Sequence, residues 1–271
     1  MFNLFKKKYR NEHSLPKRMW LNEHLSEKEI EKYKNIWNQI SGAKFIELMD
    51  KNFTPYIKSL GFKGSKNNFY KKNKPWIYTV NIFKDKYGGS CAVNVGVHLD
   101  YIENQINTLP IPSKFQVGDC IIEKNIPLDN NNSWFFYGMN ENEGIETVEL
   151  IIKMFNKKGI PFLQKFEKYP NPFDEINFDD LLSPTEKFKE FGIDSKKLDW
   201  IHFHIFLSKV NIGIKNYDLA KQIILKAWND EFNAERFDKK GVSPLLKEIE
   251  EIGKKLPPTM AINNWGESDK T

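Results

Sequence analysis

The stretches WIYTVNIFK at residues 76–84 and CAVNVGVHL at residues 91–99 decide the fold of this chain. In each stretch apolar side chains alternate with polar or small ones, which is the two-residue period of a β-strand with one buried face. The connection at 85–89 ends in Gly88 and Gly89, and glycines tolerate the positive φ that a tight hairpin needs. The sequence therefore predicts an antiparallel hairpin near the middle of the chain.

The segments around this hairpin predict further strands and packed helices. Apolar residues at helical spacing predict a helix over about 43–60, and Gly61 is suited to end it. A second helix is expected from about residue 145 until Gly159, with a short helix after it. Short strands are expected at 67–72, near 119–123 and at 133–138.

Beyond residue 182 the apolar pattern is helical, with stripes that predict helices near 200–214, 216–228 and 243–252. The predicted fold class is α+β: an antiparallel β-sheet with flanking helices, followed by an all-helical C-terminal module. The expected parts are a basic N-terminal arm and helix at 1–41, an α+β domain at 42–169, an acidic, proline-containing linker at 170–182, a helical module at 183–256 and a frayed tail at 257–271.

Composition excludes several classes of protein. The 271 residues are 40% hydrophobic and 28% charged, which is too apolar for a disordered chain. No apolar run approaches the roughly 18 residues of a membrane span, and the N-terminus lacks the apolar core of a secretory signal. The two cysteines, Cys91 and Cys120, form no metal-binding or disulfide pattern. We therefore expect a cytoplasmic protein without a cofactor or a bound metal.

Residues of about 45–166 resemble a bacterial family catalogued as domain of unknown function 4304. The matching stretches are LGFK at 60–63, NFYK at 68–71, VNI at 80–82 and VNVGV at 93–97. The chain has Phe83 where the family often has Gln. The family has no established activity, so the resemblance implies a fold and supplies no reaction. Some small bacterial domains of this kind occur in toxin–immunity neighbourhoods, which makes an immunity- or antitoxin-like role one expectation.

Charge is distributed unevenly along the chain. Residues 58–86 contain eight lysines and one acid, a net charge of +7, whereas 99–180 contain fourteen acids and seven lysines, a net charge of −7. The lysines, interleaved with aromatic residues, fit three interpretations: a solvated sheet edge that discourages strand pairing, a surface for an acidic protein, or a surface for nucleic acid. The candidate partner-binding residues are Lys63, Lys66, Tyr70, Lys71, Lys72, Lys84, Lys86 and Tyr87.

A second candidate surface is the polar face of the predicted hairpin. Strand alternation places Asn81, Asn94 and His98 on the face opposite the apolar core. This face either binds a small ligand or is covered by the C-terminal helices, and it is the site that we would assign to an enzyme.

The histidine pair His202 and His204 is the one spacing that suggests a metal. A helical stripe runs through this segment, and helical residues two apart point about 200° away from each other. We therefore expect His204 to join Ser208, Asn211 and Lys215 on the polar face of a helix, and no metal site there.

Together these patterns predict a non-enzymatic protein-binding module with an acidic partner, immunity- or antitoxin-like in role. The sequence contains no motif of a known nucleophile, metalloprotease or nucleotide-binding loop, so no catalytic residue is assigned. The alternatives are a nucleic-acid-binding accessory protein that uses the same lysines, and an enzyme on the polar sheet face.

Overall fold

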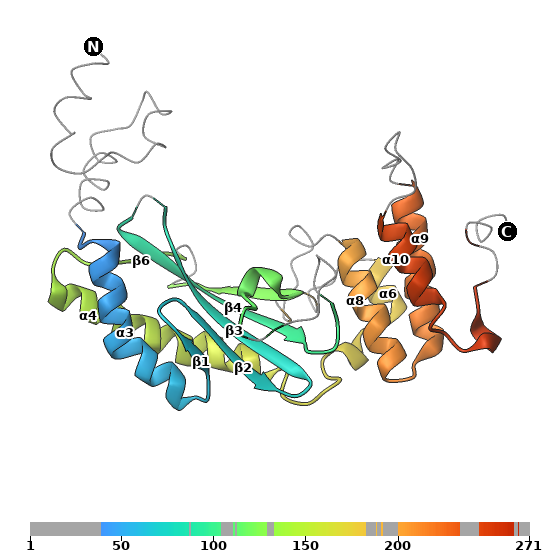
Figure 1. Cartoon of the computed structure of the whole chain (residues 1–271), viewed down its shortest axis with the longest axis horizontal. Helices are drawn as coiled ribbons and strands as arrows, with labels where there is room; N and C mark the ends of the chain where they lie inside the picture. Colours follow the sequence, from blue (N-terminus) through green and yellow to red (C-terminus); the bar gives the residue numbers. More distant parts are fainter. Residues whose placement is uncertain are drawn as a thin grey trace, which may run out of the picture. The chain divides into compact units, whose positions relative to one another are not determined.

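The computed structural model describes residues 39–86, 88–103, 111, 113–128, 133–182, 188, 191, 200–233, 244–262 and 265. The predicted helix before residue 39, the first residues of the expected helical module at 183–256 and the candidate residue Tyr87 lie outside the described residues. The described part is an antiparallel sheet with helices, followed by a helical C-terminal region (Figure 1). The predicted α+β class is confirmed.

The described strands form one sheet in the order β1-β2-β3-β4-β5, with β6 paired to β4. In β1–β2 the register places Lys63 opposite Tyr70, and in β4–β6 it places Cys91 opposite Phe135. The hydrogen bond from Asp85 N to Ser90 O closes the β3–β4 hairpin. The strands are β1 (Lys63–Ser65), β2 (Asn68–Asn73), β3 (Trp76–Lys84), β4 (Ser90–Leu99), β5 (Ile122–Ile126) and β6 (Phe135–Phe136).

The chain divides into two compact units that differ from the expected domains. The first unit combines the segment that ends at Lys71 with 79–95 and 125–161, and the second combines 72–78 and 96–124 with everything from Phe162 onward. The ends of two central strands thus belong to the same unit as the C-terminal helices. Strand residues that are far from the C-terminus in sequence supply part of the core of that unit. The expected domains were contiguous segments, so they did not include this arrangement.

In the first unit, helix α3 (Gly42–Ser59) covers one face of the sheet. It begins where the Ser41 side chain accepts a hydrogen bond from Lys44 N, and it is followed by Gly61 at φ +85°, as predicted. Phe53 of α3 contacts the ring of Phe69 on β2 with a centroid distance of 5.7 Å. The face of β2 that carries Phe69 is therefore the buried face.

A second helical run in this unit, α4 (Glu141–Met154), is longer than predicted. It continues through a π-helical turn (Phe155–Gly159) into α5 (Ile160–Gln164), so the prediction that Gly159 ends the helix is wrong. Gly159 is buried against the Phe155 ring, and a Cβ there would lie 2.7 Å from a ring carbon. Close packing against Phe155 therefore explains why a glycine is needed at this position, where the sequence pattern suggests the end of a helix.

The core of the second unit begins with Trp76, which contacts the rings of Phe166, Tyr169 and Phe173. The segment 170–182, expected as a linker, contains a 3-10 turn (Phe173–Glu175) and helix α6 (Phe178–Leu182). Its Phe173, Ile176 and Leu181 side chains are buried. This segment is part of a packed core because its three apolar side chains alternate with the exposed acids.

Helices α8 (Trp200–Gly213), α9 (Tyr217–Asn233) and α10 (Pro244–Gly253) complete the second unit. Ile205, Ile224 and Ile249 are among the buried residues that join them in one hydrophobic cluster. None of the described helices is long and apolar enough to cross a membrane.

Helix α8 corrects one expectation. His204, Ser208 and Asn211, which the pattern assigns to a polar surface, are buried. Ser208 Oγ donates to the His204 carbonyl, and Asn211 Nδ2 donates to the Leu207 carbonyl. Because these two hydrogen bonds stay within the helix, Ser208 and Asn211 can be buried although they are polar.

Candidate functional site

Two of the candidate lysines lie on the edge hairpin of the first unit. Lys63 starts the edge strand β1 and Lys66 follows it in the turn, and both are exposed. Lys66 has φ 60°, an uncommon conformation for a residue with a side chain. Neither ammonium has a carboxylate within ion-pair distance among the described residues, so both are presented outward.

Lys84 is the last residue of β3, and Lys86 lies in the hairpin that follows it. Both are exposed, and Lys84 forms no ion pair with a described residue. We call these four exposed lysines, Lys63, Lys66, Lys84 and Lys86, the outward lysines of the first unit.

The lysines of β2 have internal partners instead. Lys71 Nζ donates to the Leu60 carbonyl at 2.9 Å and lies 5.9 Å from the centroid of the Phe62 ring. Lys72 Nζ forms an ion pair with Asp100 at 2.8 Å. Tyr70 is half-buried. Lys71 and Lys72 thus contact other parts of the chain. Their ammonium groups are less available to a partner than those of the outward lysines.

The polar sheet face carries a row of asparagines in the first unit. Asn68, Asn81, Asn94 and Asn125 come from the neighbouring strands β2, β3, β4 and β5, and all four are half-buried. Asn81 Nδ2 donates to Asn68 Oδ1 at 2.6 Å, and Asn125 Nδ2 donates to Asn94 Oδ1 at 2.8 Å. The predicted residues Asn81 and Asn94 are thus the two inner members of a four-residue row.

Beside this row lies an aromatic pair, the exposed Phe83 and the half-buried Trp134, that the sequence analysis missed. The rings of Phe83 and Trp134 have a centroid distance of 6.3 Å, and Phe83 is 53% exposed. In the register that pairs Cys91 with Phe135, the small Ala92 lies between them. The signal available in the sequence was Phe83 itself, because an aromatic residue at a polar-face position of a strand needs a reason.

The third predicted member of the face, His98, is buried. His98 lies in the second unit, is 1% exposed and packs against the Phe206 ring of α8 at a centroid distance of 5.7 Å. The alternative that the C-terminal helices cover the face is therefore correct at His98. Its placement in a ligand-binding face with Asn81 and Asn94 is wrong, because burial by α8 removes it from solvent.

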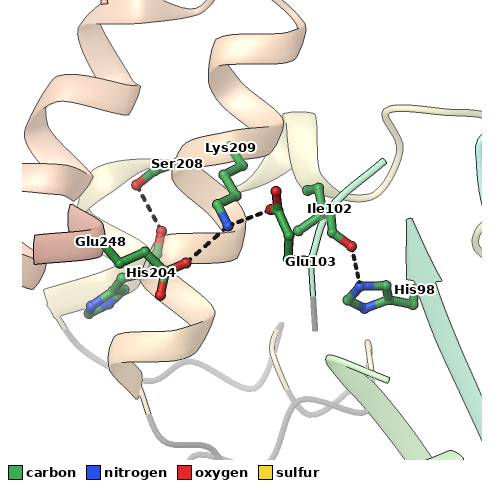
Figure 2. Close-up of polar contacts among 7 residues, drawn as sticks. All are labelled: His98, Ile102, Glu103, His204, Ser208, Lys209 and Glu248. Carbon is green, nitrogen blue, oxygen red and sulfur yellow. Dashed lines mark hydrogen bonds and ion pairs between the residues drawn. The ribbon is translucent and has the colours of Figure 1, made fainter. Parts of the chain in front are cut away.

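Both nitrogens of the His98 ring are bonded to backbone groups. Ile121 N–H donates to Nδ1 at 3.2 Å, so the proton is on Nε2, which donates to the Ile102 carbonyl at 3.0 Å (Figure 2). Burial lowers the pKa of this imidazole to about 4. A neutral ring with both nitrogens in use fixes the end of β4 and has no lone pair with which to accept a substrate proton.

A small cleft lies beside His98 in the second unit. Its polar lining includes Lys209, whose Nζ contacts Glu103 at 2.9 Å and Glu248 at 3.0 Å (Figure 2). The free volume of about 20 Å³ is that of one or two water molecules and far below that of pockets for organic ligands. The lysine and its two carboxylates satisfy one another, so the cleft is a structural ion cluster.

Among the described residues no group of three or more His, Cys, Asp or Glu side chains could hold a metal ion. His204 is buried on α8, with its Nδ1 3.9 Å from an Asp230 carboxylate oxygen, and burial lowers its pKa to about 4. The helical location of His202 and His204 was predicted correctly, whereas the solvent-facing position of His204 was not.

Residues 53–165 match the model of the family described as Domain of unknown function (DUF4304). This match confirms the resemblance expected from the sequence, over a slightly narrower range than 45–166. No curated protein and no solved structure matches the chain significantly. The matched range contains the outward lysines, the asparagine row and Trp134.

Proposed function

We propose that this chain is a non-enzymatic module that binds an acidic protein through the outward lysines Lys63, Lys66, Lys84 and Lys86, in an immunity- or antitoxin-like role. One observation carries the proposal: Lys63, Lys66 and Lys84 are exposed with no carboxylate partner among the described residues. Elsewhere in the chain, lysines such as Lys72 and Lys209 do have acidic partners.

The geometry of the β1–β2 hairpin supports this role. Gly64 has φ +117°, and a Cβ there would lie 2.3 Å from the Asn68 carbonyl oxygen. The hairpin therefore holds a tight conformation in which Lys63 and Lys66 sit on a fixed backbone. Fixed positive charge accelerates encounter with an acidic surface and orients it, and salt weakens that attraction.

Two observations favour binding over catalysis. The His98 ring has both nitrogens bonded to the backbone, and the cleft beside it holds about one or two water molecules. The proposal extends to a bacterial cytoplasmic location, which is supported by the buried cysteines Cys91 and Cys120, neither of which forms a disulfide bond.

The test is affinity capture from the native cell lysate after nuclease treatment. The wild-type chain is compared with a variant in which the four outward lysines are replaced by Glu. Its control carries the same charge change at exposed lysines of the helical face and its neighbourhood: Lys51→Glu, Lys153→Glu, Lys157→Glu and Lys168→Glu.

We expect one acidic protein to be retained by the wild type and the control and lost from the outward-lysine variant. High salt should release it. Retention of the same protein by the folded outward-lysine variant, or retention of nothing by the wild type, would overturn the proposal.

A further inference from the structure

We infer that the asparagine row and the Phe83–Trp134 pair form a second binding site, which takes a base of single-stranded nucleic acid. This site is on the sheet face of the first unit, and it shares only the flanking Lys84 and Lys86 with the protein-binding surface proposed above. The inference rests on three properties of that face: unfilled hydrogen-bonding positions at its centre, an exposed aromatic surface beside them, and adjacent positive charge.

The first property follows from the orientation of the side-chain amides. Asn81 Nδ2 also donates to the backbone carbonyl of Asn67 at 3.2 Å, and Asn125 Nδ2 also donates to the Val93 carbonyl at 3.4 Å. A carbonyl accepts only, so these contacts fix which end of each amide is nitrogen. The Asn94 oxygen, which accepts from Asn125, is fixed in turn.

This orientation leaves complementary groups side by side. The β3–β4 hydrogen bond from Asp85 N to Ser90 O sets a register in which Asn81 lies directly opposite Asn94. Asn81 Oδ1 and Asn94 Nδ2 have no hydrogen-bond partner among the described residues. The acceptor Asn81 Oδ1 and the donor Asn94 Nδ2 thus lie on adjacent strands, on side chains that face each other as a cross-strand pair. Every nucleobase carries a neighbouring donor and acceptor on one edge, so this pair can receive a base edge.

The second property is a surface on which a base can stack. Phe83 follows Asn81 on the same face of β3 and is 53% exposed. Across Ala92 its ring meets Trp134 at 6.3 Å, and Phe136, opposite Ser90 in the register, is 37% exposed. Exposed aromatic rings on a sheet are stacking platforms for unpaired bases.

The third property selects nucleic acid over a neutral sugar, which would also use amides and aromatic rings. Lys84 follows Phe83 directly and Lys86 lies in the adjoining hairpin, both exposed. The segment 58–86 has eight lysines and one acid. Phosphates of a strand whose base stacks on Phe83 would meet this positive charge.

The experiment measures fluorescence anisotropy of labelled 12-residue oligonucleotides, single-stranded and duplex, with the full chain at low and moderate salt. Phe83→Ala removes the stacking surface, and Met139→Ala is its control because Met139 is also 53% exposed. Asn94→Asp replaces the free donor by an acceptor and keeps the oxygen that accepts from Asn125. Asn142→Asp, at an exposed position of α4, controls for its charge.

We expect single strands to bind more tightly than duplex, with an affinity that falls steeply with salt. Phe83→Ala should weaken binding about fivefold or more. Asn94→Asp should weaken it more than Asn142→Asp, and Met139→Ala should bind like the wild type. Absence of binding, equal binding of duplex, or unchanged binding by both Phe83→Ala and Asn94→Asp would overturn the inference. Capture of the protein partner after nuclease treatment is a separate readout, so either proposal can fail alone.

Discussion

Lys209 in the second unit and Lys84 in the first are the same residue type in opposite situations. The side chain of Lys209 is 12% exposed and contacts two carboxylates, whereas Lys84 is exposed and has no acidic partner among the described residues. The same contrast separates the His98 ring, with both nitrogens bonded, from the inner amides Asn81 and Asn94, each with one end unfilled. Burial without a partner is costly, and the buried Lys209 and His98 side chains are paired within the fold. The unfilled ends of Asn81 and Asn94 belong to half-buried side chains, which solvent or a partner can reach.

The largest expected effect comes from breaking the ion cluster of the second unit. Lys209→Met leaves Glu103 and Glu248 beside each other without their shared cation and should lower the free energy of unfolding by about 3 kcal/mol. Guanidinium unfolding measures this difference. Lys226→Met is the control, because Lys226 pairs with Asp230 on the same helix and should cost about 0.5 kcal/mol. Equal effects of the two variants would contradict the account.

Acid should destabilise the second unit through its buried histidines. The pKa of His98 is about 4 in the folded protein and about 6.5 in the unfolded chain, so the unfolded chain binds more protons between these values. Stability is therefore full above about pH 6.5 and falls as the pH drops toward 4, by about 3 kcal/mol for His98. Urea unfolding at pH 7 and pH 4.5 measures the loss. His204 shifts the same way, so the His98→Gln variant should lose less stability between the two pH values than the wild type. An identical loss would contradict the assignment of a neutral, buried His98.

Gly64→Ala tests whether the edge hairpin must be rigid. The new Cβ would clash with the Asn68 carbonyl in a backbone conformation that disfavours side chains, at a cost of about 2 kcal/mol. We expect lower thermal stability and weaker capture of the acidic partner, although no lysine changes. Gly118→Ala, where a Cβ meets nothing within 4 Å, is the control. Unaltered capture would show that the hairpin conformation does not matter for binding.

The smallest expected effects separate paired from outward lysines. Lys72→Ala removes an ion pair with Asp100 in which the two side chains are 41% and 16% exposed, and should cost about 0.5 kcal/mol. Lys84→Ala removes no internal contact and should leave the urea midpoint unchanged. A larger loss for Lys84→Ala than for Lys72→Ala would mean that Lys84 has a structural partner.

Local periodicity explains which parts were predictable. The hairpin and α3 follow from alternation and helical spacing, because each element has one buried face. The same reasoning failed for the largely buried α8, because its polar Ser208 and Asn211 form hydrogen bonds within the helix and resemble a solvent-facing side. The Lys209–Glu103 pair joins residues 106 apart, and no local pattern indicates such a contact.

The residues of the candidate site were also predictable only in part. Alternation identified Asn81 and Asn94, and it would also have placed Asn68 and Asn125 on the same face once the strand order was known. It could not show that α8 covers His98, because the burial of a strand residue depends on elements distant in sequence. Nor could it show that Lys71 and Lys72 have internal partners.

The central claim is that the outward lysines of the first unit bind a partner and do not stabilise the fold. Its most direct test measures thermal unfolding and partner capture on the same variant. The variant replaces Lys63, Lys66, Lys84 and Lys86 by Glu. The account predicts a melting temperature like that of the equally charged control together with complete loss of the acidic partner. Retained capture, or loss of capture that accompanies loss of folding, would contradict it.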